Sequence, residues 1–331
     1  MIPYEAYQNL FEKYKINHWQ TIEKAWQEKH RFYHNEEHLA FLLNKIQLSP
    51  WSEAEKEILY LVAFFHDIVY KPKGQDNEEK SAELFEELCG ANEAIKRQVS
   101  EMILDTKSHT PSSELSEYFC KIDLAIVTDS NFTELLAWEK KIFKEFQVFD
   151  YSLYKIGRLN VLEKLKKQNP HNAQNLQYLI EYLSVYRPNI GVYPGSFNPF
   201  HNGHYDILEK AEQVFDKVII ARGMNPEKTE IAINDDINPV LYYRQTEGFG
   251  GFLTDYMASK EKDADMTLIR GLRNGDDLAY EINQLGFMKD LKTDLKVVFF
   301  HCDREFEHIS SSAIRNLEKI SKGFGDRYLP K

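Results

Sequence analysis

The sequence contains little cysteine. Three of its 331 residues are cysteines, Cys89, Cys120 and Cys302, and no Cys-x-x-Cys pair occurs. A disulfide framework needs an even set of cysteines and a zinc ribbon needs closely spaced pairs, so the sequence suggests neither. We therefore expect a protein of a reducing compartment.

A long apolar run is also missing. The longest, around residues 59–65, is far shorter than the roughly 20 residues that cross a bilayer. The first residues lack the charged and then apolar segments of a secretory signal. We therefore expect a cytoplasmic location and no membrane partner.

The third absence is a block of basic residues. The net charge is -11, and lysines and arginines stand singly along the chain. A nucleic-acid partner is not expected, because binding to a phosphate backbone needs a basic surface. A length of 331 residues is sufficient for two domains.

Hydrophobic periodicity divides the chain into two parts. Residues 4–186 mostly show a 3.6-residue period, and we expect helices over 53–69, 77–88, 95–104 and 138–146. Short β-branched runs then alternate with helical segments, which predicts a parallel sheet. The expected strands are 190–193, 217–221, 240–244, 267–269 and 295–300. We therefore expect a multidomain protein, with an all-α domain over 1–187 and an α/β domain over 188–331.

Residues 190–204 carry the strongest local pattern. They predict a buried strand, a tight turn built on Gly195 and Pro199, and a helix with His201 and His204 in its first turn. A strand that enters a helix through a glycine turn directs backbone N–H groups and the positive end of the helix dipole at one point. The pattern therefore predicts a phosphate-binding site, to which the two histidines add donors.

The run from Gly195 to His204, Gly-Ser-Phe-Asn-Pro-Phe-His-Asn-Gly-His, resembles the His-x-Gly-His signature of the nucleotidyltransferase superfamily. Further motifs follow in order: Asn225-Pro-Glu-Lys228, Arg270-Gly-Leu-Arg273 with Asp277, Tyr280 and Glu281, and Ile309-Ser-Ser-Ser312. The second of these is similar to bacterial phosphopantetheine adenylyltransferase. The resemblance implies a Rossmann-like domain that transfers an adenylyl group from ATP to a phosphorylated acceptor, 4′-phosphopantetheine, with Mg²⁺, giving dephospho-coenzyme A.

The same resemblance implies roles for single residues. His204 would bind the transferring phosphoryl group, Arg273 the pyrophosphate of ATP, and Arg270 the acceptor. Ser196 and Lys228 would contact the reacting phosphates. The residues expected around the nucleotide are Gly195, Phe197, His201, Asp277, Glu281, Ser310, Ser311 and Ser312. The three serines would cap a helix whose N–H groups take the β- and γ-phosphates.

The sequence departs from this family in two places. Only residues 229–238 separate the Lys228 loop from the next predicted strand, where the family has a longer helical connection, and the sequence stops at 331, where the family usually continues into a last helix. In the family these elements help to cover the nucleotide and to build subunit contacts. The sequence therefore does not decide how tightly ATP binds or whether the chain forms a homo-oligomer. A nicotinamide mononucleotide adenylyltransferase is an alternative, supported by the full His201-x-x-His204 pair and by residues 309–315.

In the helical part, histidines and carboxylates stand where an amphipathic pattern does not require them. His66 and Asp67 end the most apolar predicted helix, His34 and His38 lie on an earlier one, and Asp123 follows a later aromatic segment. Histidine nitrogen with carboxylate oxygen suits Mn, Fe, Ni, Co or Zn. Scattered surface histidines with a capping aspartate are the alternative, and these residues alone leave both open.

The wider pattern resembles the HD superfamily of metal-dependent phosphohydrolases in residues 33–39, 63–70, 76–82, 106–109 and 122–124. The resemblance implies that His34, His66, Asp67 and Asp123 hold one or two metal ions. Such a metal would lower the pKa of bound water and polarise a phosphoryl oxygen.

Lys107 and His109 are candidates for holding the substrate phosphate of this second site, with an exposed loop as the alternative. Together the two resemblances imply a bifunctional enzyme. The remaining alternative is that one domain has lost its chemistry and serves as a ligand-sensing or interaction module.

Overall fold

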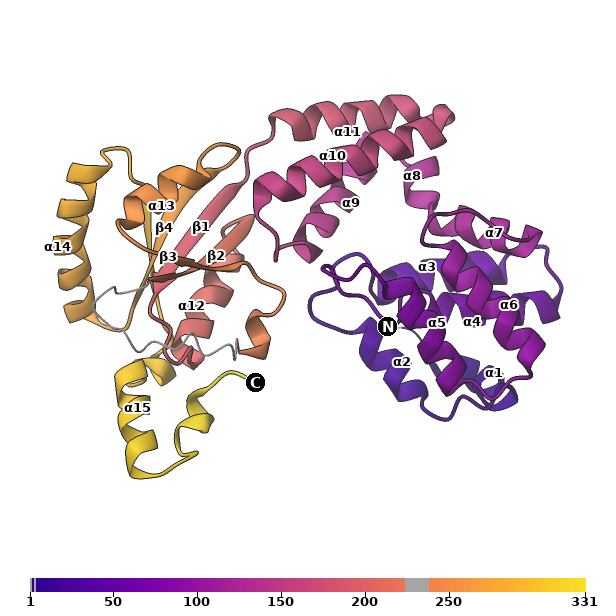
Figure 1. The fold of residues 1–331 in the computed structure, drawn as a ribbon, viewed down its shortest axis with the longest axis horizontal. Helices are drawn as coiled ribbons and strands as arrows, with labels where there is room; N and C mark the ends of the chain where they lie inside the picture. The colour runs from indigo at the N-terminus through magenta and orange to yellow at the C-terminus, as the bar shows by residue number, and fades with distance from the viewer. Residues whose placement is uncertain (1, 3, 224–237) are drawn as a thin grey trace. The chain divides into compact units, whose positions relative to one another are not determined.

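The structure is a computed structural model that describes residues 2, 4–223 and 238–331 (Figure 1). The chain forms two compact units. Unit 1 comprises Met1–Glu145 and Asn160–Glu181, and unit 2 comprises Phe146–Leu159 and Tyr182–Lys331. Among the described residues, no helix has the length and apolar composition that crossing a membrane requires.

This division differs from the single boundary near residue 188 that the sequence suggests. The segment after Glu145 belongs to unit 2, because polar groups of the sheet region hold it. The buried Lys217 donates its Nζ to the carbonyl of Gln147, and Lys260 Nζ lies 2.9 Å from Asp150 Oδ2. Neither pairing is visible in hydrophobic periodicity.

Unit 1 consists of helices and loops over its described residues. Its α-helices are α1 (Gln8–Lys13), α2 (Trp19–Trp26), α3 (Glu36–Gln47), α4 (Glu53–Phe65), α5 (Asn77–Leu88), α6 (Glu93–Asp105), α7 (Glu114–Asp123), α8 (Ala125–Asp129) and α9 (Phe132–Glu145). Helices α10 (Tyr151–Gln168) and α11 (Ala173–Val185) have residues in both units. The predicted helical character of this region is confirmed.

Helix α4 forms the centre of unit 1. Ser52 begins it with a capping box, in which the Glu55 carboxylate accepts the Ser52 N–H and Ser52 Oγ accepts the Glu55 N–H. Leu59, Leu61 and Phe64 have no exposed surface, and the helix packs against α3, α5, α6 and α7. The helix ends at Phe65, earlier than the predicted residue 69. His66 and Asp67 therefore lie in the turn that follows the helix.

The prediction that His34 lies on a helix is wrong. Helix α3 begins at Glu36, because the side chain of Asn35 accepts the Glu37 N–H at 2.9 Å and acts as the N-cap. His34 therefore lies in the preceding turn, and His38 is on the helix.

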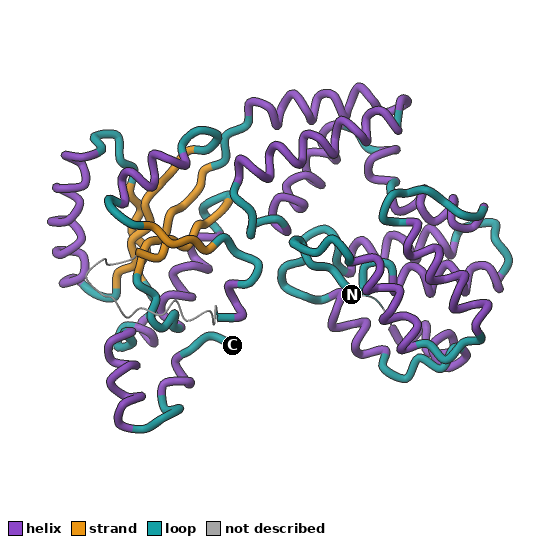
Figure 2. Tube along the Cα trace, in the orientation of Figure 1, coloured by secondary structure: helices purple, strands orange, loops and turns teal. Residues whose placement is uncertain are grey.

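Unit 2 is built on a five-stranded parallel sheet, seen as the orange strands in Figure 2, and the predicted parallel sheet is confirmed. Its order is β3-β2-β1-β4-β5, with β1 (Asn189–Gly195), β2 (Lys217–Gly223), β3 (Thr246–Phe249), β4 (Asp265–Leu272) and β5 (Val297–His301). Strand β1 is central and pairs with both β2 and β4. The α-helices of this part are α12 (Asn202–Glu212), α13 (Leu253–Lys260), α14 (Gly275–Leu291) and α15 (Ser311–Ile320).

The predicted strand over residues 240–244 is wrong. This segment starts with a 3-10 helix, Pro239–Leu241, in which the Asn238 side chain accepts the Val240 N–H at 3.1 Å. Arg244 then donates to the Val240 carbonyl and pairs with Glu212. The backbone N–H groups of Leu241, Tyr242 and Arg244 also bond to carbonyls within the segment. These N–H groups are therefore not available to a sheet ladder, and the strand begins only at Thr246.

Candidate functional sites

A cavity of about 460 Å³ lies at the carboxyl ends of β1 and β4. These two strands are neighbours at the point where the strand order reverses, which is where ligands bind in open α/β sheets. Ten of the residues that the sequence singled out line the cavity: Gly195, Phe197, His201, His204, Arg270, Arg273, Asp277, Glu281, Ser310 and Ser311. Elements far apart in the sequence therefore bring most of these residues to one place.

Three expected residues are not among the lining residues. Ser196 and Ser312 are exposed, although each is next in the chain to a lining residue, Gly195 and Ser311. Lys228 lies outside the described residues. The cavity also includes side chains that sequence reasoning missed, among them Tyr193, Cys302 and Phe306. Tyr193 belongs to the 190–204 pattern but received no role there, and Cys302 and Phe306 follow β5 outside the motifs noted in the sequence.

The two histidines cap helix α12 together. His201 Nδ1 accepts the backbone N–H of His204 at 3.4 Å, and His204 Nδ1 accepts the backbone N–H of His201 at 3.3 Å. Because both Nδ1 atoms are acceptors, each neutral ring carries its proton on Nε2. The two Nε2–H groups are therefore the donors that these rings can offer to a ligand in the cavity.

Electrostatics keep both rings neutral. Burial, followed by the nearby Arg273, lowers the pKa of His201 to about 4. Burial also lowers the pKa of His204 well below its ordinary value, with His201 and Arg273 acting in the same direction. At neutral pH the pair can donate hydrogen bonds to an anion without adding charge.

Positive charge in the cavity comes from two arginines at the end of β4. Arg273 donates from Nε and Nη2 to the two oxygens of Asp277, at 2.9 Å each. This bidentate pair holds the pKa of the Asp277 carboxyl below its ordinary value. Arg270 Nε lies 3.0 Å from Glu281 Oε2. Asp277 and Glu281 are one turn apart on α14, so this helix orients both guanidinium groups. An anionic ligand in the cavity would compete with these two carboxylates for the arginines.

The start of α15 is fastened to the loop after β1. Ser310 is the N-cap, and its Oγ accepts the Ala313 N–H at 3.2 Å. Ser311 Oγ donates to the Pro199 carbonyl at 3.0 Å. The positive end of the helix dipole thus adjoins the cavity, where it favours negative charge.

Gly195 is a place where only glycine fits. A Cβ atom at this position would lie 2.8 Å from the ring of Phe197. The Phe197 ring is buried, so it has little room to move away from an added methyl group. The turn that carries the loop into α12 therefore depends on this close approach.

In unit 1, His38, His66 and Asp67 offer ligand atoms that all lie within 4.8 Å of one another. Asp123 adjoins them, with its Oδ1 3.1 Å from His38 Nε2 and 3.7 Å from His66 Nε2. The structure thus brings together His66, Asp67 and Asp123, which the resemblance assigns to metal binding, with His38, which the sequence pattern marks and the resemblance leaves out. The sequence signal for His38 is its place four residues after His34, one turn into α3.

Within the described part of the chain, two buried nitrogens of this cluster, His38 Nε2 and His66 Nε2, make no well-aligned hydrogen bond. Their nearest partners are carboxylate oxygens, Asp123 Oδ1 at 3.1 Å and Asp67 Oδ2 at 3.2 Å. His66 Nδ1 lies 3.0 Å from the Ala63 carbonyl, which can only accept, so Nδ1 carries a proton and Nε2 can hold a lone pair. Imidazole nitrogens and carboxylate oxygens that face one another without well-aligned hydrogen bonds are an arrangement that a shared metal ion can satisfy. A divalent cation fits this donor set.

The electrostatics of the cluster agree with a cation site. Burial raises the pKa of Asp67, but the neighbouring His66 outweighs burial and brings it below the ordinary value. Burial lowers the pKa of His66, but Asp67 outweighs it and brings it to about 9. Without a metal, protonated His66 therefore supplies the positive charge that keeps Asp67 ionised. A divalent cation bound at this place would take over that role and displace the proton.

His34, His109 and Lys107 are placed differently. The His34 ring centroid is 5.9 Å from that of His38, and its Nδ1 lies 2.7 Å from Oε2 of Glu145. His109 reaches the cluster, with Nε2 3.2 Å from Asp123 Oδ2. Lys107 instead binds the Glu79 carboxylate, at 2.7 Å for Oε2, and the Gln75 carbonyl. Sequence reasoning missed Glu145, since it is an ordinary acidic residue at the end of α9.

Comparisons with known proteins match the C-terminal part of the chain. Residues 192–317 match the cytidylyltransferase-like family. The phosphopantetheine adenylyltransferase of Clostridium novyi is 35% identical over 139 residues, which are 39% of this chain and 82% of the relative. That of Alkaliphilus metalliredigens is 31% identical over 149 residues, 43% of this chain and 92% of the relative. A solved structure, a putative nicotinate-nucleotide adenylyltransferase from Vibrio parahaemolyticus, matches with a TM-score of 0.32 and 17% identity, covering 43% of this chain and 94% of that chain.

Proposed function

Because the C-terminal part of the chain belongs to the phosphopantetheine adenylyltransferase family of nucleotidyltransferases, we propose that its cavity transfers an adenylyl group from ATP to 4′-phosphopantetheine. The products are dephospho-coenzyme A and pyrophosphate. The observation that carries the proposal is the convergence of two neutral histidine donors and two arginines on one cavity at the switch point of the sheet.

The reaction needs no protein nucleophile. A phosphate oxygen of the acceptor attacks the α-phosphorus of ATP in line, and the P–O bond to pyrophosphate breaks. The protein therefore positions two anions and neutralises the charge that grows on the transferring group. The Nε2–H groups of His201 and His204 and the guanidinium of Arg273 are suited to that charge, and Arg270 to the acceptor phosphate. ATP enters as its Mg²⁺ complex, which shields the phosphates from one another.

The test is pyrophosphate release by the full chain with ATP, Mg²⁺ and one acceptor at a time. Release with 4′-phosphopantetheine and not with nicotinamide mononucleotide supports the proposal. Release with nicotinamide mononucleotide alone would favour the alternative that His201 and residues 309–315 suggest. Release with neither, under conditions where ATP binds, would leave the cavity as a ligand-sensing module.

A second function is favoured by the convergence of ligand atoms from His38, His66 and Asp67, which all lie within 4.8 Å of one another. We propose that His38, His66, Asp67 and Asp123, with His34, hold one or two divalent transition metals such as Mn, Fe, Ni, Co or Zn, and that unit 1 is a phosphohydrolase. When bound, such a metal activates water and polarises a phosphoryl oxygen. His109, which contacts Asp123, is placed to donate to a substrate phosphate, whereas Lys107 must first leave Glu79.

This second proposal is tested by metal analysis of the purified chain and by phosphate release from p-nitrophenyl phosphate and from nucleoside monophosphates. Metal-dependent release supports a phosphohydrolase. A chain that binds metal but releases no phosphate from any of them would favour an interaction or sensing role for unit 1. A chain that takes up none of the five metals would leave the cluster without a metal function.

A further inference from the structure

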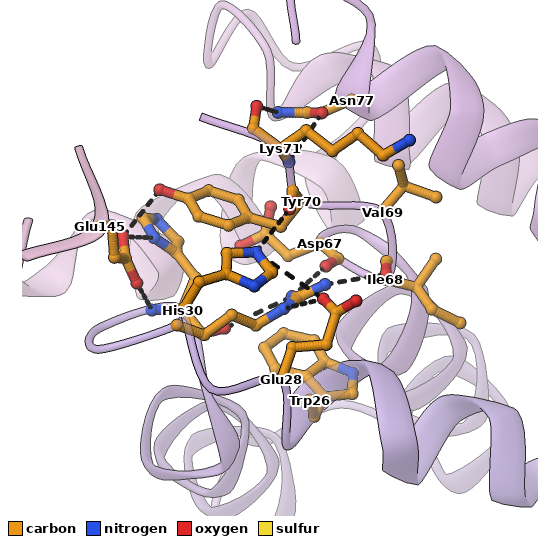
Figure 3. Close-up of polar contacts among 12 residues, drawn as sticks. Trp26, Glu28, His30, Asp67, Ile68, Val69, Tyr70, Lys71, Asn77 and Glu145 are labelled. Carbon is orange, nitrogen blue, oxygen red and sulfur yellow. Dashed lines mark hydrogen bonds and ion pairs between the residues drawn. The ribbon is translucent and has the colours of Figure 1, made fainter. Parts of the chain in front are cut away.

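Glu145 is a carboxylate of unit 1 with hydrogen-bond partners on both of its oxygens. It is the last residue of α9, and its side chain has no exposed surface. Figure 3 shows Glu145 facing the hydroxyl of Tyr70, which donates to Oε2 at 2.7 Å. The turn before α3 supplies its other partners, although more than 110 residues of chain separate the two segments.

The first oxygen of Glu145 holds the backbone of that turn. Oε1 accepts three successive N–H groups, from Phe32 at 2.9 Å, Tyr33 at 2.7 Å and His34 at 2.9 Å. Three convergent N–H groups form a small anion-binding concavity, which fixes the path of the chain around the carboxylate. The turn therefore cannot shift without breaking several charge-assisted hydrogen bonds.

The second oxygen fixes the side chain of His34. Oε2 lies 2.7 Å from His34 Nδ1 and is also bound by Tyr70. An ionised carboxylate can only accept, so Nδ1 of His34 is the protonated nitrogen and Nε2 of the neutral ring holds the lone pair. The ring is also held from one side by Tyr70, whose ring centroid is 4.4 Å away in a stacked arrangement.

His34 lies next to the group formed by His38, His66 and Asp67 but is not one of its members. Its ring is 5.9 Å from that of His38, and the charges of Asp67 and Asp123 act on it. The backbone of the turn is tied to the Asp67 loop as well, since Arg31 donates to the carbonyls of Asp67 at 2.6 Å and Ile68 at 2.9 Å. The turn and the loop are thus held in one arrangement around the cluster.

We propose that Glu145 is the positioning residue that orients His34 as a metal ligand, by fixing both the turn and the tautomer of the ring. The inference rests on the metal site proposed for unit 1. A carboxylate that binds the second nitrogen of a ligating histidine sets the ring orientation and raises the basicity of the ligating nitrogen. Removing such a partner lowers metal affinity roughly 10- to 100-fold.

The experiment compares Mn²⁺ binding by the full chain and its variants in calorimetric titrations. Glu145→Gln keeps the size of the side chain but loses its charge, and we expect Mn²⁺ to bind roughly 10- to 100-fold more weakly. Tyr70→Phe removes one hydrogen bond to Glu145 and leaves His34 bonded, so a smaller loss is expected. Glu139→Gln is the matched control, a buried glutamate on the same helix, and we expect an affinity within about twofold of wild type.

The outcomes separate this inference from the metal site itself. A wild-type chain that binds no Mn²⁺ overturns both. A wild-type chain that binds Mn²⁺ and a Glu145→Gln variant that binds it equally well overturn the positioning role alone. Should Glu145→Gln fail to fold, the ¹⁵N chemical shifts of His34 in the metal-free wild type still decide, measured at a pH high enough for the ring to be neutral. A proton on Nε2 instead of Nδ1 then contradicts the inference.

Discussion

The imidazole rings of His201 and His204 stack with centroids 3.6 Å apart and 21° between their planes. Each ring also accepts the backbone N–H of the other residue. Two rings this close cannot both be charged without strong repulsion, and burial lowers the pKa of each. The pair therefore behaves as one neutral donor unit at the start of α12.

Replacing His204 should abolish adenylyl transfer and leave ATP binding measurable. The Nε2–H of His204 is expected to bind most strongly to the charge that appears in the transition state, so His204→Ala should lower kcat by roughly 10²- to 10³-fold with little change in KM. Steady-state pyrophosphate release measures both constants. Turnover near that of wild type would mean that the active site lies elsewhere.

The two arginines should act on different substrates. Arg270→Ala should mainly raise KM for the acceptor and Arg273→Ala should mainly weaken ATP, each through the loss of a charge-assisted contact of about 1.5–3 kcal/mol. Initial rates at varied ATP and varied acceptor separate the two effects. The opposite pattern would exchange the two subsites.

Stability should depend on pH through His201. Its folded pKa of about 4 lies below the value of about 6.5 in the unfolded chain, so between these pH values the unfolded state binds more protons. The free energy of unfolding should therefore fall as the pH falls through this window, by up to about 3 kcal/mol from this residue. Denaturant unfolding at several pH values gives the free energy of unfolding of wild type and of His201→Asn. Asparagine is chosen because it also serves as an N-cap residue. Parallel curves for the two proteins would mean that the pKa of His201 is not lowered.

A methyl group at Gly195 should disturb the cavity. The added Cβ of Gly195→Ala would meet the Phe197 ring at 2.8 Å, and overpacking of this kind costs about 1–3 kcal/mol. Gly250→Ala is the control, because a Cβ there has nothing within 4 Å. The melting temperature and the rate of adenylyl transfer should both fall in Gly195→Ala and stay unchanged in Gly250→Ala. Equal melting temperatures would show that the turn can relax.

Asp67→Ala should remove the metal of unit 1 together with phosphatase activity. A carboxylate adds formal charge to the site, so its loss should weaken metal binding more than the loss of one neutral imidazole. Adenylyl transfer should survive, because the cavity residues all belong to unit 2. Metal content and both activities, measured on the same preparations, test this. Loss of both activities would indicate general unfolding.

The sequence by itself determined the features that depend on neighbouring residues. The strand from Ile190, the turn at Gly195 and the helix with His201 and His204 follow from turn chemistry and periodicity over 15 residues, and so does the alternation that predicts a parallel sheet. Periodicity failed where a local hydrogen bond took the place of a bond between strands. The Asn238 side chain binds the Val240 N–H, and the predicted strand over 240–244 lies several residues before β3.

Only the tertiary structure decided which distant residues meet. It placed His38 in the cluster with His66 and set His34 against Glu145, and it paired Arg270 and Arg273 with carboxylates of α14. A hydrogen bond across more than 100 residues leaves no period or spacing in the sequence, because its geometry depends on how whole helices pack. Glu145 in particular looks like any surface glutamate until α9 buries it beside the turn that it holds.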